Sequence, residues 1–440
     1  MLAGAPDALA VIDASSGVAW TYRALAAEVG AAAQRLVAAA GAGPAFLFAR
    51  NDLATVIELL AALTAGVPIA VLAGDLDDAR AAALIARYRP TAILGRALAP
   101  APGGPRPHAD LGLLLSTSGS TGHPKLVRLS AAAVIANARA IAAALDLGPG
   151  QVAPTSLPLA YSFGLSIVTS HLVAGATVVV TDAGLLEPRF WATCRAHHVT
   201  SLAGVPYSYQ LLRRLDLAQV APLSLTTLTQ AGGRLDPSVV RHVAGLAAAR
   251  GGGLYVMYGQ TEATARIAVL PPRELPAAAG AVGWAVPGGA IAIDGGEVIY
   301  RGPNVMLGYA ESVDDLAVGD VQGGVLRTGD RGYLDERGRL WLTGRVGRHA
   351  KVFGLRVELD ELEAVARAVP GVDAVAALAG DDRIRIAIEG AGPEVLAAVR
   401  AALAAHVGVH PSGFAVAAVA VLPRQPSGKI DYSRLDEPAP

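Results

Sequence analysis

Residues 111–125 read Leu-Gly-Leu-Leu-Leu-Ser-Thr-Ser-Gly-Ser-Thr-Gly-His-Pro-Lys, an apolar run that passes directly into hydroxyl residues and glycines. The apolar run, residues 111–115, predicts a buried strand. In the loop that follows, small residues let backbone N–H groups converge on an anion, and Lys125 adds a mobile positive charge. This combination suits a polyphosphate. A polar surface turn has a similar composition, and the residues alone do not decide between the two.

The loop differs from the P-loop of the common nucleotidases. That motif requires a glycine, four further residues, and then Gly-Lys followed by serine or threonine. Here Lys125 follows Pro124 and is followed by Leu126. A phosphate-binding role is therefore compatible with this stretch, but the P-loop class is excluded.

The bulk composition restricts the class of protein. The 440 residues are too many for one hydrophobic core and predict two or three domains. Apolar residues make up 53% of the chain, much of it alanine, but the best candidate membrane span, residues 53–72, is broken by Gly66 and Pro68. No membrane span is therefore expected, and residues 1–11 lack the basic segment of a signal peptide.

The cysteine content and the net charge restrict the cellular compartment and the kinds of partner that are expected. Cys194 is the only cysteine, so no intrachain disulfide can form, which fits a reducing, cytoplasmic location. A single cysteine is more often a small buried residue than a nucleophile. The net charge of −1, without a long basic run, gives no support to nucleic acid as a partner.

Short apolar strands alternate with helical stretches over the first part of the chain. This pattern predicts an α/β fold with a large N-terminal domain of mostly parallel sheets covered by helices, with ligands at the carboxyl ends of the strands. The predicted strands are residues 8–13, 46–48, 67–72, 92–94, 111–115, 176–180, 201–203, 227–230 and 254–257. The predicted helices are residues 22–40, 54–65, 79–88, 131–145, 189–197, 207–215 and 237–249.

The pattern changes after residue 270, where glycine and proline become frequent. A small β-rich part is expected at about residues 271–345, with strands at 290–294, 297–301, 324–328 and 339–343. Residues 346–440 predict a small α+β domain with helices 358–368 and 393–406 and strands 372–378, 383–388 and 414–421. We therefore expect a large domain, 1–345, and a C-terminal domain, 346–440.

Four further stretches carry polar residues at strand ends or turns. Tyr258-Gly259-Gln260-Thr261-Glu262 can stack a base, approach a phosphate and hold Mg²⁺, or can be a solvated turn. Ala231-Gly232-Gly233 lets a flat ring lie on the backbone. Thr328-Gly329-Asp330, with Gly344-Arg345 further on, offers a carboxylate for the vicinal hydroxyls of a ribose. Lys429 follows a Ser-Gly turn, where most lysines are simply solvated.

The order of these motifs resembles the adenylate-forming superfamily, which includes acyl- and aryl-CoA synthetases, adenylation domains of peptide synthetases, and luciferases. The resemblance covers nearly the whole chain. Further matching stretches are residues 20–25, 157–164, 283–288, 296–303, 305–309 and 351–356. Members activate an acid with MgATP as an acyl-adenylate, release pyrophosphate, and mostly pass the acyl group to the thiol of CoA or of a carrier protein's phosphopantetheine.

The resemblance implies a role for each matching residue. The β- and γ-phosphates would be held by Thr117, Ser118, Gly119, Ser120, Thr121, Gly122 and Lys125. The adenine would lie against Gly232, Gly233 and Arg234, with Tyr258 stacked on it and Gly259 and Gln260 beside it. Thr261 would contact the α-phosphate, Glu262 would hold Mg²⁺, and Asp330 and Arg345 would hold the ribose. Lys429 would bridge the carboxylate and the α-phosphate.

The resemblance also implies an acyl pocket and a mobile C-terminal domain. The pocket would be lined by Tyr161, Phe163, Gly164, Val205, Tyr207, Ser208, the Gly232-Gly233 turn and Arg266. The C-terminal domain would rotate between the two half-reactions about a hinge at Gly347, and a thiol channel would run along Lys351 and Gly354.

Two features of the pocket region bear on the substrate. Arg266 either pairs with a second anionic group of the substrate or is a structural surface arginine, which is the commoner case for a lone arginine after a loop. Amino-acid-activating relatives carry an aspartate where this chain has residues 162–166, which include no acid, so an α-amino acid is disfavoured.

Three positions depart from the family pattern, and the acceptor stays open. Gly347 stands where relatives carry Asp or Lys, Leu126 where glycine follows the loop lysine, and Tyr161 where many have histidine. The function implied is an acid–thiol ligase. The alternatives are a ligase that delivers to an amine, including one that adenylates a small inorganic acid such as nitrite, and a non-catalytic nucleotide-binding homologue. The intact Glu262 and Lys429 argue against the last.

Overall fold

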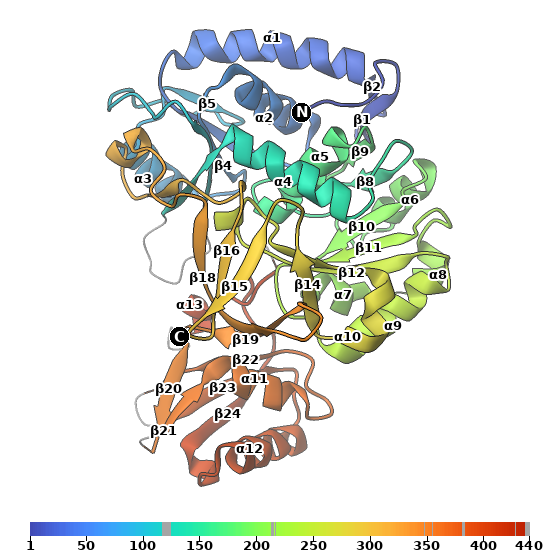
Figure 1. Cartoon of the computed structure of the whole chain (residues 1–440), viewed down its shortest axis with the longest axis vertical. Helices are drawn as coiled ribbons and strands as arrows, with labels where there is room; N and C mark the ends of the chain where they lie inside the picture. Colours follow the sequence, from blue (N-terminus) through green and yellow to red (C-terminus); the bar gives the residue numbers. More distant parts are fainter. Residues whose placement is uncertain are drawn as a thin grey trace. The chain divides into compact units, whose positions relative to one another are not determined.

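The computed structural model describes residues 1–116, 125–212, 215, 217–346, 348–353, 355–380, 383–426 and 428–435. The chain divides into two compact units (Figure 1). Unit 1 consists of Met1–Ile291 and Tyr300–Leu326, and unit 2 of Ala292–Ile299 and Arg327–Pro440. The β-rich part expected at residues 271–345 contributes to both units, and the domain boundary expected after residue 345 stays a prediction.

The first large sheet of unit 1 has the strand order β17-β7-β6-β4-β3-β5. The bounds are β3 (Ala45–Ala49), β4 (Ile69–Ala73), β5 (Ala92–Leu94), β6 (Leu111–Ser116), β7 (Leu126–Ser130) and β17 (Gly308–Ala310). Strands β5, β3, β4 and β6 pair in parallel, whereas β7 and β17 pair antiparallel. Every residue of β3 is buried, as expected for a parallel strand covered on both faces.

Two further sets of strands complete unit 1. One sheet has the order β2-β1-β9-β8, with β1 (Leu9–Asp13), β2 (Ala19–Thr21), β8 (Val152–Pro154) and β9 (Thr177–Val180). The other strands follow in the order β10 (Ser201–Gly204), β11 (Thr227–Gln230), β12 (Gly253–Tyr258), β13 (Ala268–Leu270) and β14 (Ala281–Ala285). Strands β10, β11 and β12 are parallel, so their carboxyl ends lie at one edge.

The helices of unit 1 begin at sequence-encoded caps. The side chains of Thr21, Asp52, Asp77 and Ser130 accept N–H groups at the starts of α1 (Tyr22–Ala40), α2 (Leu53–Ala65), α3 (Asp78–Tyr88) and α4 (Ala131–Ala144). The remaining helices are α5 (Ser162–Val173), α6 (Pro188–Ala196), α7 (Pro206–Leu212), α8 (Leu217–Val220), α9 (Pro237–Ala248) and α10 (Leu275–Ala278). Short 3₁₀ turns are η1 (Thr261–Ala263), η2 (Pro272–Glu274) and η3 (Asp314–Ala317).

Several short elements were not predicted from the sequence, among them strands β8, β13, β14 and β17, and two larger misses are helix α5 and strand β7. Ser162 to Leu172 in α5 are all buried, polar residues included, so the helix has no exposed face and no amphipathic pattern. In β7 the charged Arg128 interrupts an otherwise apolar strand. Both misses have the same cause, because each segment is buried irrespective of the polarity of its residues.

Unit 2 combines a β-hairpin region with a small α+β core. Its strands are β15 (Ala290–Asp294), β16 (Glu297–Arg301), β18 (Val325–Leu334), β19 (Leu340–Arg345), β20 (His349–Val352), β21 (Leu355–Glu358), β22 (Val375–Leu378), β23 (Ile384–Glu389) and β24 (Phe414–Val419). Its helices are α11 (Leu359–Arg367), α12 (Pro393–Val407) and α13 (Tyr432–Leu435), with the turn η4 (Pro411–Gly413). Buried residues of α11, α12 and the β22-β23-β24 sheet form one core. This agrees with the expected α+β domain.

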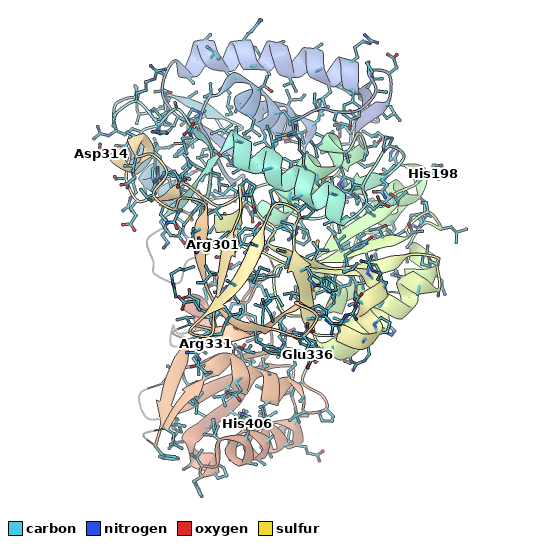
Figure 2. The ribbon with its side chains drawn as sticks, viewed as in Figure 1. His198, Arg301, Asp314, Arg331, Glu336 and His406 are labelled. Carbon is cyan, nitrogen blue, oxygen red and sulfur yellow. The ribbon has the colours of Figure 1, made fainter. Side chains whose placement is uncertain are left out.

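The surface and interior separate as in other globular folds. Polar side chains such as Asp314 in unit 1 and His406 in unit 2 are exposed (Figure 2). Cys194 is buried, and burial raises the pKa of its thiol to about 12, so it is a small core residue rather than a nucleophile. Within the described residues, no helix is both long and apolar enough to cross a bilayer.

Arg128 is a buried arginine whose hydrogen bonds are satisfied by the backbone. Its side chain is 1% exposed. The guanidinium donates to the carbonyl oxygens of Tyr309 at 3.1 Å, Leu307 at 3.2 Å and Gly319 at 3.3 Å, and also to that of Val318. It therefore joins β7 to the segment around β17.

Replacing Arg128 by methionine is expected to lower the free energy of unfolding by about 3 kcal/mol or more, because four carbonyl oxygens each lose the hydrogen bond from the guanidinium. Urea unfolding, with the exposed Arg87→Met as control, measures this. Equal stability of Arg128→Met and the control would show that Arg128 does not join these segments.

His171 of α5 is held as a neutral imidazole inside unit 1. Its Nδ1 lies 2.8 Å from the Ile167 carbonyl oxygen and its Nε2 lies 3.2 Å from Ser201 Oγ. Burial lowers the pKa of His171 to about 4, because it disfavours the charged ring. The unfolded chain has the ordinary pKa of about 6.5.

Stability should therefore depend on pH through His171. Between about pH 6.5 and 4 the unfolded chain binds a proton that the folded chain does not, so His171 lowers stability by up to about 1.4 kcal/mol per pH unit. We expect the wild type to lose more stability than His171→Gln as the pH falls from 7 to 5, measured by urea unfolding. Carboxylates titrate in both proteins, so identical slopes would show that His171 is not the cause.

Candidate active site

The loop after β12 folds tightly back on itself. A Cβ on Gly259 would lie 1.9 Å from the carbonyl oxygen of Ala265, so only glycine allows this approach. Thr264 and Ala265 have φ values of 56° and 111°. The chain therefore returns to the end of β12 at Ala265. The turn η1 places Thr261 and Glu262 at the tip of the loop.

Two buried asparagines hold this loop in place. Asn304 donates to the carbonyl oxygens of Ala263 at 2.7 Å and Arg266 at 3.0 Å, and Thr264 Oγ1 donates to the Asn304 carbonyl at 2.6 Å. Asn137 of α4 also donates to the Arg266 carbonyl, at 2.9 Å. The sequence analysis did not identify either asparagine, since their partners lie far away in the chain.

Glu262 has a dedicated donor and a cation nearby. Tyr309 at β17 donates its O–H to Glu262 Oε1 at 2.8 Å, and Lys125 Nζ lies 3.7 Å from the centre of the Tyr309 ring. Burial and the charge of Glu262 both raise the pKa of Tyr309, so the phenol stays protonated and donates. Lys125 and Glu262, separate motifs in the sequence, are thus brought together through Tyr309.

Thr261 contacts the start of α5. Its Oγ1 lies 3.2 Å from Ser162 Oγ, so the tip of the loop and the first turn of the helix share a hydrogen bond. The first residues of α5 therefore lie beside Thr261, and the predicted pocket residues Tyr161 and Phe163 flank Ser162.

The glycine turn after β11 lies against Tyr161. Gly232 has φ of +84°, and a Cβ there would lie 2.7 Å from the Tyr161 hydroxyl and 3.1 Å from Val205. Gln230 Nε2 donates to the Gly233 carbonyl oxygen at 2.8 Å and fixes the turn. The adjacent Arg234 is exposed.

Four of the predicted pocket residues meet in one apolar cluster. Phe163 and Val205 are buried members of it, and Tyr161 and Tyr207 pack against it. The Tyr161 and Phe163 rings lie 6.3 Å apart in an edge-to-face arrangement. Two predicted residues have structural contacts as well. Ser208 Oγ accepts the Val205 N–H at 3.2 Å, and a Cβ on Gly164 would lie 2.1 Å from the Pro158 carbonyl.

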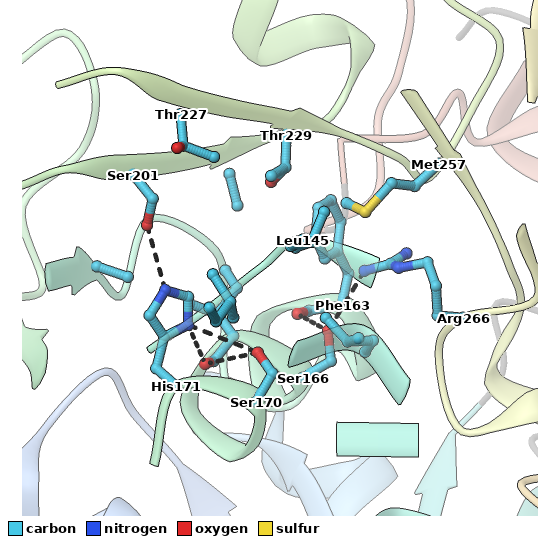
Figure 3. A pocket seen from close by; sticks show the side chains of 15 residues that line it. Leu145, Phe163, Ser166, Ser170, His171, Ser201, Thr227, Thr229, Met257 and Arg266 are labelled. Carbon is cyan, nitrogen blue, oxygen red and sulfur yellow. Dashed lines mark hydrogen bonds between the residues drawn. The ribbon is translucent and has the colours of Figure 1, made fainter. Parts of the chain in front are cut away.

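A small cavity lies beside this cluster, between α4, α5 and strands β10–β12 (Figure 3). It measures about 20 Å³, which is room for about one water molecule. Apolar side chains form much of its wall, and its polar lining residues are Ser166, Ser170, His171, Ser201, Thr227, Thr229 and Arg266. Only Phe163 and Arg266 of this lining belong to the predicted pocket.

Arg266 is buried, which corrects the expectation of a surface arginine. Its side chain is 2% exposed, and its guanidinium lies 4.5 Å from the centre of the Phe163 ring. Burial lowers its pKa to about 10, so it is charged at neutral pH. The sequence offered one sign of this burial, because Arg266 directly precedes the apolar run 267–270, but no strand was predicted there.

Unit 2 carries the remaining candidate residues. Asp330 of β18 and Arg345 of β19 are register partners, and Arg345 Nε donates to Asp330 Oδ1 at 3.1 Å. Asp330 is buried, whereas the Arg345 side chain is 64% exposed and accessible to a ligand. Lys429 lies at a turn where its carbonyl oxygen accepts the Gln425 N–H at 2.8 Å.

Several predicted residues lie outside the described part of the chain. These are the phosphate-loop residues Thr117, Ser118, Gly119, Ser120, Thr121 and Gly122, the hinge Gly347, and Gly354 of the thiol channel. Lys351 is in β20, and its side chain is not described. The roles predicted for these residues stay predictions.

Comparisons with known proteins relate the chain to a family. Residues 97–310 match the family model described as AMP-binding enzyme. An indoleacetate–CoA ligase of Aromatoleum aromaticum is 32% identical over 53% of this chain and 47% of its own length. An L-proline–[L-prolyl-carrier protein] ligase of Streptomyces coelicolor is 31% identical over 75% of this chain and 66% of its own length. The chain spans about half the length of the first curated relatives it matches.

Solved structures show the same fold. The o-succinylbenzoate CoA synthetase of Bacillus subtilis, solved with its acyl-adenylate intermediate, superposes with a TM-score of 0.79 at 22% identity, over 99% of this chain and 96% of that chain. The ATP-bound MatB of Rhodopseudomonas palustris has a TM-score of 0.80 at 22% identity, over 98% and 95%. The expected α/β fold is confirmed, and residues 97–310 form a domain of the AMP-binding enzyme family.

Proposed function

We propose that this chain activates a small carboxylic acid with ATP and transfers the acyl group to a thiol of CoA or of a carrier protein. The observation that carries the proposal is the Lys125–Tyr309–Glu262 arrangement, in which a carboxylate is oriented by a half-buried phenol beside a lysine. The names of the relatives, CoA ligases and one carrier-protein ligase, support a thiol acceptor.

Glu262 fits a Mg²⁺ ion by its chemistry. Tyr309 occupies Oε1, and among the described residues no hydrogen bond reaches Oε2. Mg²⁺ is commonly held by one or two carboxylates together with phosphate oxygens. When bound, the ion would neutralise phosphate charge. Lys125 would add positive charge for the departing phosphates.

In the first half-reaction a carboxylate oxygen of the acid attacks the α-phosphorus of ATP. The bond from that phosphorus to the β-bridging oxygen breaks, and pyrophosphate leaves. Two anions must approach each other, so neutralising charge and fixing position supply most of the rate enhancement. We assign the adenine to the Gly232-Gly233 turn and Tyr258, the ribose to Asp330 and Arg345, the α-phosphate to Thr261, and the approaching carboxylate to Lys429.

In the second half-reaction a thiol sulfur attacks the carbonyl carbon of the adenylate. The bond from this carbon to the phosphate oxygen breaks, AMP leaves, and the thiol proton passes to solvent. We assign the acyl group to the cluster of Tyr161, Phe163, Val205 and Tyr207, beside the glycine turn.

Replacing Lys429 by alanine is expected to lower ATP–pyrophosphate exchange by ~10²–10³-fold, because a preorganised cation is lost at the transition state. The assay uses a panel of small acids and the wild type. Arg434→Ala, which removes an exposed cation of the same unit, is the control. If no acid supports exchange by the wild type, the adenylation proposal fails. Adding CoA, a phosphopantetheinylated carrier or an amine then identifies the acceptor that consumes the adenylate.

Replacing Tyr309 by phenylalanine is expected to raise the Mg²⁺ concentration for half-maximal exchange by ~10–100-fold, because the partner that orients Glu262 is lost. Tyr88→Phe, which removes an O–H that donates to the Ala310 carbonyl, controls for the loss of a buried hydroxyl. An unchanged Mg²⁺ requirement in Tyr309→Phe would show that Glu262 does not hold the metal.

A further inference from the structure

Arg266 is a buried cation that the described protein does not neutralise. It donates to Ser166 Oγ and to the Ala265 carbonyl oxygen, both at 3.4 Å, beyond the usual N–H···O range. Its Nε is buried and has no acceptor. No ion pair joins it to a carboxylate of the described residues, and its guanidinium lies against the face of the Phe163 ring, 4.5 Å from the ring centre.

Arg128 shows what a structural arginine looks like in the same unit. Both side chains are almost fully buried. Arg128 donates to four backbone carbonyls, whereas Arg266 has two long contacts and an unsatisfied Nε. Burying an unpaired charge is costly, and a methionine of similar length would pack against Phe163 without that cost. The retained charge therefore points to a ligand.

The position of Arg266 defines where that ligand lies. Figure 3 shows its guanidinium directed toward Phe163 and Ser166, at the wall of the cavity. Ser166 is one helical turn beyond Ser162, whose hydroxyl lies 3.2 Å from that of Thr261. Residues one turn apart on a helix have Cβ atoms ~5–6 Å apart. An acid reacting beside Thr261 would therefore reach Arg266 over a short distance.

We propose that the acid activated by this chain is short and carries a second anionic group, a carboxylate or a sulfonate, which Arg266 binds. This inference rests on the proposed function. A guanidinium pairs with either group through two parallel N–H···O bonds. The Ser166 hydroxyl already donates to the Phe163 carbonyl oxygen at 2.7 Å, so Arg266 supplies the donors for the ligand. The small cavity limits the size of the group at this end of the pocket.

The test compares acids of similar size and different charge in ATP–pyrophosphate exchange. Malonate, succinate and sulfoacetate are compared with butyrate and pentanoate, which lack the second charge. We expect the wild type to prefer a dianion by ~10²-fold or more in kcat/KM, and Arg266→Met to lose ~10²–10³-fold on that acid. Arg266→Lys, which keeps the charge without the paired donors, should lose less. The dianion preferred by the wild type separates a dicarboxylate from a sulfonate.

The melting temperature distinguishes a ligand-binding role of Arg266 from a structural role. Without ligand, Arg266→Met should melt at or above the wild-type temperature, because it removes an unpaired buried charge. Arg128→Met, which removes a satisfied arginine, should melt lower. A fall in Arg266→Met as large as that in Arg128→Met would overturn the proposal.

The two proposals fail in distinguishable ways. Lys429-dependent exchange with monoanionic acids alone would overturn the role of Arg266 and leave the proposed function standing. A preference for a dianion that survives in Arg266→Met would also overturn that role. If no acid supports exchange, the proposed function fails, and the melting temperature with the same dianions then decides. If the dianions raise the melting temperature of the wild type but not that of Arg266→Met, anion binding by Arg266 is supported. Equal shifts of the melting temperature in both proteins would refute it.

Discussion

The close contact between Gly259 and the carbonyl of Ala265 is the constraint on which the candidate site depends. A Cβ at residue 259 would lie 1.9 Å from that oxygen, so any other residue would force the loop open. Because the loop closes, Glu262 meets Tyr309 while Arg266 enters the interior. This one backbone contact thus places the Glu262 carboxylate beside Tyr309 and the Arg266 guanidinium in the interior. Asn304 and Asn137 keep the loop closed by binding its carbonyl oxygens.

The buried charges of unit 1 differ in how they are compensated. Arg128 is surrounded by carbonyl oxygens, and its hydrogen bonds join segments that are distant in sequence. His171 avoids charge altogether, since burial keeps its imidazole neutral. Arg266 keeps its charge without such compensation. Burial alone therefore does not distinguish a structural arginine from a binding arginine, and the acceptor geometry around the guanidinium does.

The sequence predicted the elements whose pattern is local. Strands β5 and β11 have the predicted bounds, since each is a short run enriched in apolar or β-branched residues between turn residues. Helix α5 was not predicted because it is buried on all sides. Strand β7 was not predicted because a charged residue lies inside the sheet. In the candidate site, Asp330 and Arg345 come from two motifs read from the chain and form an ion pair, while their contact with a ribose stays a prediction. The hydrogen bond between Tyr309 and Glu262 joins residues that are 47 positions apart, so no local sequence pattern predicts it.

Helix α5 connects the two ends of the pocket. Its first residue, Ser162, contacts Thr261, where we place the reacting phosphate, and one turn later Ser166 contacts Arg266. Still further along, His171 closes the cavity against Ser201. Because an α-helix has a fixed rise of 1.5 Å per residue, these contacts set the distance between the reacting end of an acid and its far end. Burial on all sides, which leaves this helix without an amphipathic pattern in the sequence, also fixes it in the core. A helix fixed in this way can discriminate acids by length and by terminal charge.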